Sequence, residues 1–104
     1  MYFTNAKAYI KKEETFSIWN KCYVSCDSAY LYVKKKATKK TNYYEFKLRL
    51  LKVSKKYLEY KGRLCFGIMY ENKKYMLGFE QETACNRIFQ TLKQLAKENQ
   101  TQKI

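Results

Sequence analysis

The sequence predicts a mainly β domain whose antiparallel strands are closed by one C-terminal α-helix. Short runs of alternating apolar and polar residues, the period of a half-buried strand, occupy most of the chain. From Thr83 onward the spacing changes to that of one buried helical face, with apolar residues at Cys85, Ile88, Phe89, Leu92, Leu95 and Ala96. Because this helix follows all the strands, it cannot connect parallel strands, and we expect it to cover an antiparallel sheet assembly.

The first half of the chain predicts four strands. Residues 6–12 form the first, with Ala8 and Ile10 on one face. Residues 16–26 form the second, with one face made by Ile18, Asn20, Cys22, Val24 and Cys26. Asp27 and Ser28 supply a turn, after which residues 29–34 return as a hairpin partner. Residues 34–42 form a lysine-rich loop, and the fourth strand begins at residue 43 with one face made by Tyr44, Phe46, Leu48 and Leu50.

The second half predicts three more strands and the helix. Residues 52–60 suit a short strand and a turn that ends near Gly62. A hairpin follows, with its turn at Glu71 and Asn72 and apolar positions at Leu64, Phe66, Ile68, Tyr70, Tyr75, Leu77 and Phe79. The helix is predicted over residues 83–97. The side chains that we expect to be buried are Ile10, Val24, Leu31, Phe66, Ile68, Leu77, Ile88, Phe89 and Leu92.

The length and composition are those of one folded domain. The chain has 104 residues, enough for one hydrophobic core, so we expect a single domain over residues 1–104, with strands at about 6–80 and the helix at about 83–97. Hydrophobic residues make up 46% and aromatic residues 17% of the chain, which is more than a disordered segment carries.

The charge favours anionic partners. The formal net charge is +13 and comes almost entirely from lysine, which lacks the planar fork with which arginine binds a phosphate. We therefore expect attraction to anionic surfaces that is broad rather than stereospecific. The N-terminus lacks the pattern of a signal peptide and no apolar run reaches transmembrane length, so we expect a cytoplasmic protein whose membrane contact, if any, is peripheral.

The residue types argue against catalysis and against a metal site. The chain has no histidine for acid–base chemistry at neutral pH and no glycine-rich phosphate cradle, so we expect neither enzymatic activity nor a cofactor. The four cysteines lie within apolar-periodic segments and lack paired C-x2-C spacing, which predicts buried free thiols rather than zinc ligands; they are Cys22, Cys26, Cys65 and Cys85.

The order of these elements, and several short motifs, resemble a pleckstrin-homology (PH) domain over about residues 6–95. The stretch Ala8-Tyr9-Ile10-Lys11-Lys12 is similar to the family's first-strand pattern G-x-L-x-K, and Trp19 stands where the second strand opens. Phe66-Gly67-Ile68 and Tyr75-Met76-Leu77-Gly78-Phe79 are similar to its later hairpin, whereas Phe89 replaces the usual tryptophan of the helix. The resemblance implies a PH-like barrel of two antiparallel sheets, about seven strands in all, capped by the helix. The wider superfold, with phosphotyrosine-binding and EVH1-like domains, stays an alternative.

The resemblance also implies an incomplete phosphoinositide pocket. Members that bind phosphoinositides use a lysine at the end of the first strand and two basic residues early in the second. Lys12 matches the first of these, but the other two positions hold Asn20 and Cys22. Lys21 lies between them and falls on the opposite face of the strand. We therefore expect weak affinity for soluble inositol phosphates.

Three kinds of partner remain open. The first is an anionic phospholipid membrane, bound by lysines that the resemblance places at one end of the barrel, with Lys21 as a further candidate; this lysine rim consists of Lys11, Lys12, Lys34, Lys35 and Lys36. The second is a protein with an acidic segment, docked on a sheet edge or beside the helix. The third, less favoured, is single-stranded nucleic acid held by residues 34–40 and the rings of Tyr43 and Tyr44.

Overall fold

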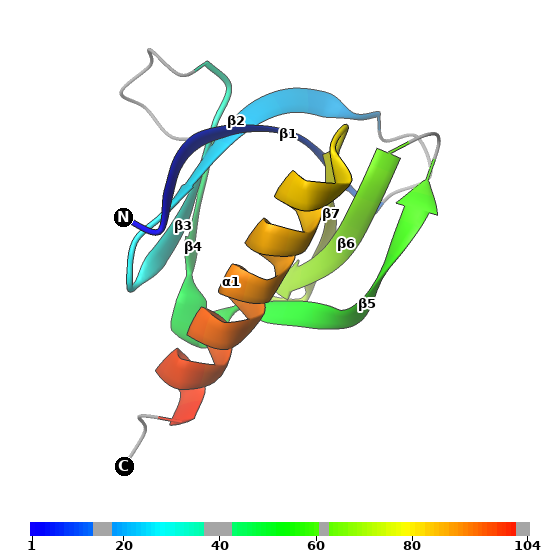
Figure 1. The fold of residues 1–104 in the computed structure, drawn as a ribbon. Helices are drawn as coiled ribbons and strands as arrows, with labels where there is room; N and C mark the ends of the chain where they lie inside the picture. Colours follow the sequence, from blue (N-terminus) through cyan, green and yellow to red (C-terminus); the bar gives the residue numbers. More distant parts are fainter. Residues whose placement is uncertain (14–17, 37–42, 61–62, 102–104) are drawn as a thin grey trace.

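The computed structural model describes residues 1–13, 18–36, 43–60 and 63–101, and it contains seven strands and one long helix in these ranges (Figure 1). The elements, in chain order, are β1 (Phe3–Lys12), β2 (Asn20–Cys26), β3 (Tyr30–Lys34), β4 (Tyr44–Lys47), the 3-10 turn η1 (Leu48–Leu50), β5 (Lys52–Tyr60), β6 (Arg63–Tyr70), β7 (Lys73–Phe79) and α1 (Glu82–Thr101). The predicted architecture, with strands first and one helix last, is confirmed.

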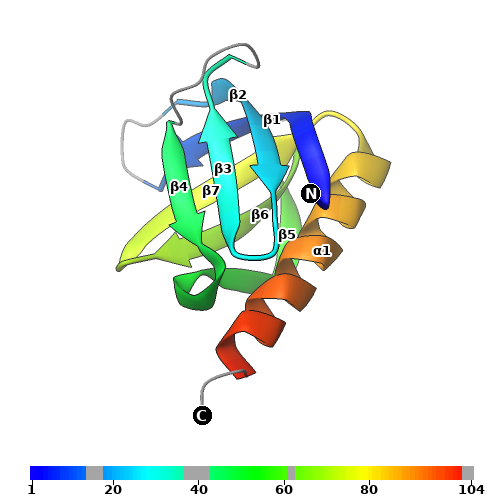
Figure 2. The ribbon, with the colours of Figure 1, turned by 90° about the vertical axis from the view of Figure 1, so that its left-hand side faces the viewer.

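Strand β1 joins the two halves of the sheet. Neighbouring strands run antiparallel in the order β4-β3-β2-β1-β7-β6-β5. β1 pairs with β2 from Phe3 to Ile10 and with β7 from Tyr9 to Lys12. A register shift between Phe3 and Ala6, together with a left-handed backbone at Asn5 (φ 48°), bends the strand. The sheet therefore folds into two layers, with β2–β4 in front of β5–β7 in Figure 2 and α1 along their side.

The interior contains the predicted core. All nine side chains that we expected to be buried are buried, and α1 packs its apolar face against η1 and strands β5 to β7. Phe89 from the helix meets Phe66 with ring centroids 5.2 Å apart, so it occupies the place under the sheet for which the resemblance implied an aromatic ring. The predicted burial of all four cysteines is confirmed, and no disulfide joins them. Burial raises the pKa of Cys22 and Cys26 to about 12 and that of Cys85 to about 11.

Two strand predictions were wrong. Ile18 was expected on the inward face of a strand over 16–26, but β2 begins at Asn20 and Ile18 is 73% exposed. The fourth strand was expected to continue through Leu50, but it ends at Lys47 and residues 48–50 form η1, which leaves Leu50 42% exposed. Leu48 of this 3-10 turn is buried, and the turn packs against α1.

Other boundaries moved by a few residues. β1 begins at Phe3 rather than residue 6, β5 spans nine residues rather than a short strand, and α1 begins at Glu82 and extends to Thr101. The predicted turn between β6 and β7 is confirmed, since Glu71 and Asn72 both have positive φ (50° and 66°), as a two-residue type I′ hairpin requires. Residues 37–42 of the loop predicted over 34–42, the first two residues of the strand predicted over 16–26 and the predicted turn near Gly62 lie outside the described residues.

The turn between β2 and β3 is held by one carboxylate. Asp27 accepts hydrogen bonds from the backbone N–H groups of Ala29 (2.8 Å) and Tyr30 (2.7 Å) and from the Tyr32 hydroxyl (2.8 Å). Partial desolvation raises the pKa of Asp27, but these hydrogen bonds outweigh it and hold the pKa below its ordinary value. The hydrogen bond from the Tyr32 hydroxyl to Asp27 raises the pKa of Tyr32 to about 12. The turn that the sequence predicts at Asp27 is therefore present, and the Asp27 carboxylate stabilises it.

Candidate functional site

Lys12 stands at the mouth of the barrel. Along β1, Ala8 and Ile10 point into the core, and the same alternation places Lys12 on the inner face where the strand ends, paired with Tyr75 of β7. The backbone N–H of Glu13 then donates to the carbonyl of Lys74 over 2.9 Å. This bond fixes the end of β1 against the β6–β7 hairpin, so that Lys12 is held half-buried beside the turn.

A basic hollow opens between the end of β1 and the β6–β7 turn. Its volume is about 440 Å³, and it is lined by Lys12, Glu13, Asn72, Lys73 and Lys74. Three lysines face one carboxylate, so the hollow suits an anion. The sequence analysis did not single out Asn72, Lys73 or Lys74. Their closeness to Lys12 depends on pairing between β1 and β7, which no local pattern reveals.

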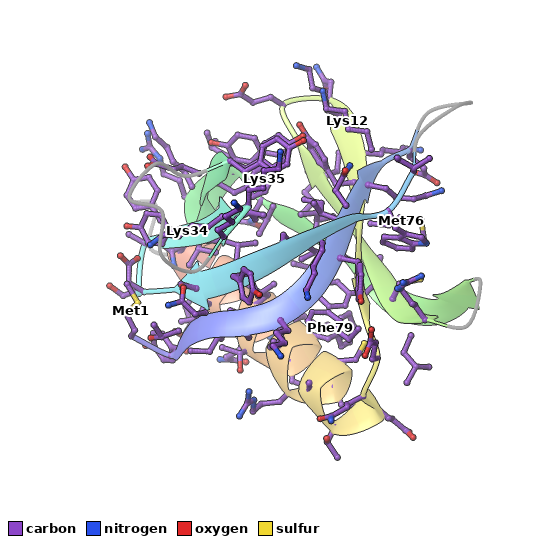
Figure 3. The ribbon with its side chains drawn as sticks, turned by 90° about the horizontal axis from the view of Figure 1, so that it is seen from above. Met1, Lys12, Lys34, Lys35, Met76 and Phe79 are labelled. Carbon is purple, nitrogen blue, oxygen red and sulfur yellow. The ribbon has the colours of Figure 1, made fainter. Side chains whose placement is uncertain are left out.

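Lys34, Lys35 and Lys36 leave the end of β3 at the same end of the molecule. Lys34 is half-buried, and Lys35 and Lys36 are exposed. An aromatic contact joins this end to the first lysine group, because Tyr44 of β4 meets Tyr75, the pairing partner of Lys12, with ring centroids 5.3 Å apart. Figure 3 shows Lys12 beside the β6–β7 hairpin and Lys34 and Lys35 on the side of β3.

The other two predicted lysines lie on outer surfaces. Lys11 points away from the interior, and its Nζ lies 5.7 Å from the centre of the Trp19 ring. Lys21 pairs with Tyr9 on the outer face of β2. The structure therefore gathers Lys12 and residues 34–36 at one end, keeps Lys11 on the outside of the same strand, and places Lys21 elsewhere.

Lys21 belongs to a second cleft, where β1 separates from β7. Pairing with β7 starts only at Tyr9, and the opening before it is about 380 Å³ in volume. Its floor contains Ala6, Ala8, Phe79 and Ala84, and its polar rim contains Lys7, Lys21, Arg87 and Glu80. Glu80 accepts a hydrogen bond from the Tyr9 hydroxyl, which partly occupies that carboxylate and leaves the rim predominantly cationic.

The structure shows the surroundings of Cys22 and Asn20, the two positions at which the resembling PH domains carry basic residues. Cys22 has 0% of its surface exposed, so a ligand cannot reach its thiol. Asn20 is exposed, and its Nδ2 donates to the carbonyl of Ile18 over 3.3 Å. Neither side chain brings positive charge to the mouth of the barrel, where the charge comes from Lys12 and the β6–β7 turn.

Other kinds of site find little support in the described residues. No group of three or more histidine, cysteine, aspartate or glutamate side chains within them could hold a metal ion. The one long helix among them is too polar to cross a membrane. What this part of the chain offers is a set of cationic and apolar surfaces.

Comparison with solved structures identifies the fold. No protein-family model matches the chain, and no curated protein matches it. A structure from a systematic screen for protein–lipid interactions in Saccharomyces cerevisiae is 16% identical, covers 90% of this chain and 97% of its own, and superposes with a TM-score of 0.69. The PH domain of human TBC1 domain family member 2 is 14% identical, with 97% and 87% covered and a TM-score of 0.68. The Slm1 PH domain in complex with inositol 4-phosphate is 16% identical, with 89% and 97% covered and a TM-score of 0.64.

Proposed function

We propose that this PH-like domain is a non-catalytic, cytoplasmic module that attaches peripherally to anionic phospholipid membranes. Three separate segments bring cations to one end of the barrel: the end of β1 with Lys12, the end of β3 with residues 34–36, and the β6–β7 turn with Lys73 and Lys74. This gathering is the observation that carries the proposal. The similar structures add support, since one comes from a protein–lipid screen and another holds inositol 4-phosphate.

The expected binding depends on charge rather than on headgroup identity. Each lysine near an anionic leaflet contributes about 1 kcal/mol, so the lysine rim with Lys73 and Lys74 gives about 5–7 kcal/mol, or a dissociation constant on the order of 10–200 μM. Soluble inositol phosphates should bind weakly, because Asn20 and buried Cys22 stand where phosphoinositide-binding relatives would present basic side chains.

Vesicle sedimentation tests the proposal. Vesicles of phosphatidylcholine alone and of phosphatidylcholine mixed with phosphatidylserine, phosphatidic acid or a phosphoinositide are compared at 0.1 M and 1 M salt. Attachment to all anionic vesicles is expected at low salt, and it should fade at 1 M, where the Debye length falls from about 10 Å to about 3 Å. Failure to sediment with any anionic vesicle at low salt would reject the proposal.

A matched pair of variants locates the surface. Changing Lys34, Lys35 and Lys36 to glutamate should abolish vesicle binding, because Lys35 and Lys36 are exposed where β3 ends and Lys34 is half-buried beside them. Changing three exposed cations of α1 to glutamate alters the net charge by the same amount and should leave most of the binding; these are Arg87, Lys93 and Lys97. Equal loss in both variants would mean that overall charge, and not this end of the barrel, drives attachment.

A second candidate function is recognition of an acidic protein segment in the cleft between β1 and α1. The cationic rim of Lys7, Lys21 and Arg87 above a floor of small apolar side chains favours it. In that case Lys21→Glu should abolish capture of the partner and leave vesicle binding intact. Single-stranded nucleic acid ranks third, because the rings of Tyr43 and Tyr44 stack on each other with centroids 4.7 Å apart, a contact that serves packing. An oligonucleotide that fails to compete with vesicles for the protein would agree with that ranking.

A further inference from the structure

A groove runs along the outer face of β6 and β7, next to the basic hollow. Two cross-strand rows define it. In the first, Lys52, Met69 and Lys74 lie side by side; in the second, Gly67 lies beside Met76. The groove has a volume of about 420 Å³, within the range of small-molecule sites, and its walls include both methionines.

Gly67 leaves the floor of the groove open. Its backbone N–H donates to the Ser54 hydroxyl over 3.0 Å, and a Cβ at this position would lie 3.7 Å from Ser54 and 3.9 Å from the carbonyl oxygen of Tyr75, both ordinary contact distances. Packing therefore does not require glycine here. At Gly78 on the next strand, by contrast, a Cβ would lie 3.0 Å from the Trp19 ring, so that space is already filled.

The groove adjoins the basic hollow. Glu13 and Lys74 line both, which places an apolar channel directly beside the pocket of Lys12, Lys73 and Lys74. Methionine walls suit a flexible chain, because the thioether is polarisable and the side chain adapts to irregular shapes. A basic hollow that adjoins such a channel has the polarity of a single amphiphile.

We propose that the groove holds the acyl chain of an anionic monoacyl phospholipid whose phosphate occupies the basic hollow. This inference rests on the proposed function and adds a defined lipid site to a surface attraction. An apolar protein segment would gain little from three lysines at one end of the groove, whereas a lipid with one phosphate and one chain uses both parts. Met76 and Lys12, on adjoining strands, mark the two parts in Figure 3.

Titration calorimetry with three soluble probes tests the site. Two probes are lysophosphatidic acid and lysophosphatidylcholine of the same chain length, both monomeric below their critical micelle concentrations. The third is glycerol 3-phosphate, which has no acyl chain. Lysophosphatidic acid should bind at least tenfold more tightly than either of the others. Its affinity should also rise with chain length, by up to about fourfold per methylene, until the groove is full.

Two variants keep the test specific to the groove. Gly67→Val adds a strand-compatible side chain where a Cβ fits, so it should fill the floor, remove the dependence on chain length and leave vesicle attachment through the lysine rim unchanged. Met76→Gln is the second variant, for use if Gly67→Val is unstable. Met76 is half-exposed and tolerates a polar group, and this change should lower the affinity for lysophosphatidic acid. Circular dichroism and the thermal midpoint confirm that each variant is folded.

The outcomes separate this inference from the proposed function. If lysophosphatidic acid binds no better than glycerol 3-phosphate, or if folded Gly67→Val binds it as wild type does, the groove holds no acyl chain, although vesicle attachment can persist. Equal affinity for lysophosphatidylcholine would overturn the link to the basic hollow. Loss of vesicle attachment with retained lysophosphatidic acid binding would instead reject the proposed function alone.

Discussion

Replacing Phe89 by alanine removes a buried ring of α1 that packs against Phe66 of β6. Phe89 is 3% exposed, and its ring lies 5.2 Å from that of Phe66, which in turn stacks on Phe79 at 5.9 Å. Truncating a buried phenylalanine costs about 3–5 kcal/mol through lost burial and the cavity left behind. A domain of this size has a free energy of unfolding of about 5–15 kcal/mol, so Phe89→Ala should remove a large share of it.

Urea denaturation, followed by circular dichroism, measures this loss. With a slope of about 2 kcal/mol per M, the unfolding midpoint should fall by about 1.5–2.5 M. Gln90→Ala is the matched control, because Gln90 is the next residue of the helix and is exposed; its effect should stay within about 0.5 kcal/mol. A midpoint that Phe89→Ala leaves unchanged would refute the packing of α1 described above.

Three further predictions concern single positions. Gly78→Ala should displace the Trp19 ring, alter the tryptophan emission spectrum and cost about 1–3 kcal/mol in urea denaturation, whereas Gly67→Ala should do neither; equal effects would contradict the described contacts. Because the pKa of Asp27 is lowered in the folded state, the stability it contributes is complete at neutral pH and is lost as the pH falls below about 4 toward the folded pKa. Asp27→Asn should therefore be less stable at pH 7 and lose less stability than wild type between pH 7 and pH 3, and parallel pH profiles would argue against this role. The four buried cysteines should react with a thiol reagent at pH 8 only after unfolding, and native mass spectrometry should give the mass of the bare, reduced chain; rapid labelling of the folded protein or bound zinc would contradict burial or the free-thiol assignment.

Local patterns predicted those parts of the fold that local physics determines. The helix, the turn at Glu71 and Asn72 and the Asp27 turn each follow from neighbouring residues, and each is present. The error at Leu50 arose because a 3-10 turn carries apolar residues at 48 and 50, a spacing that also suits a strand. Choosing between them requires knowing that α1 lies against this turn.

The candidate site was only partly predictable for a related reason. Lys12 was found because the pattern of the resembling family points to it, and the run at 34–36 because it is continuous in sequence. Lys73 and Lys74 were missed, since they reach Lys12 only through the pairing of β1 with β7. Pairings between distant strands are set by the whole core, and no window of the sequence contains them.

The double pairing of β1 also governs the order in which this domain can assemble. Tyr9 contacts Glu80, 71 residues further along the chain, and β1 pairs with β7, so the barrel closes only after β7, the last strand, has been synthesised. Until then one edge of β1 has unpaired backbone N–H and C=O groups, and such an edge can pair with a strand of another chain. Lys11 and Lys12 lie in the part of β1 that later pairs with β7, and Lys7 lies just before it; their positive charge disfavours pairing with another chain and so protects the growing chain against aggregation.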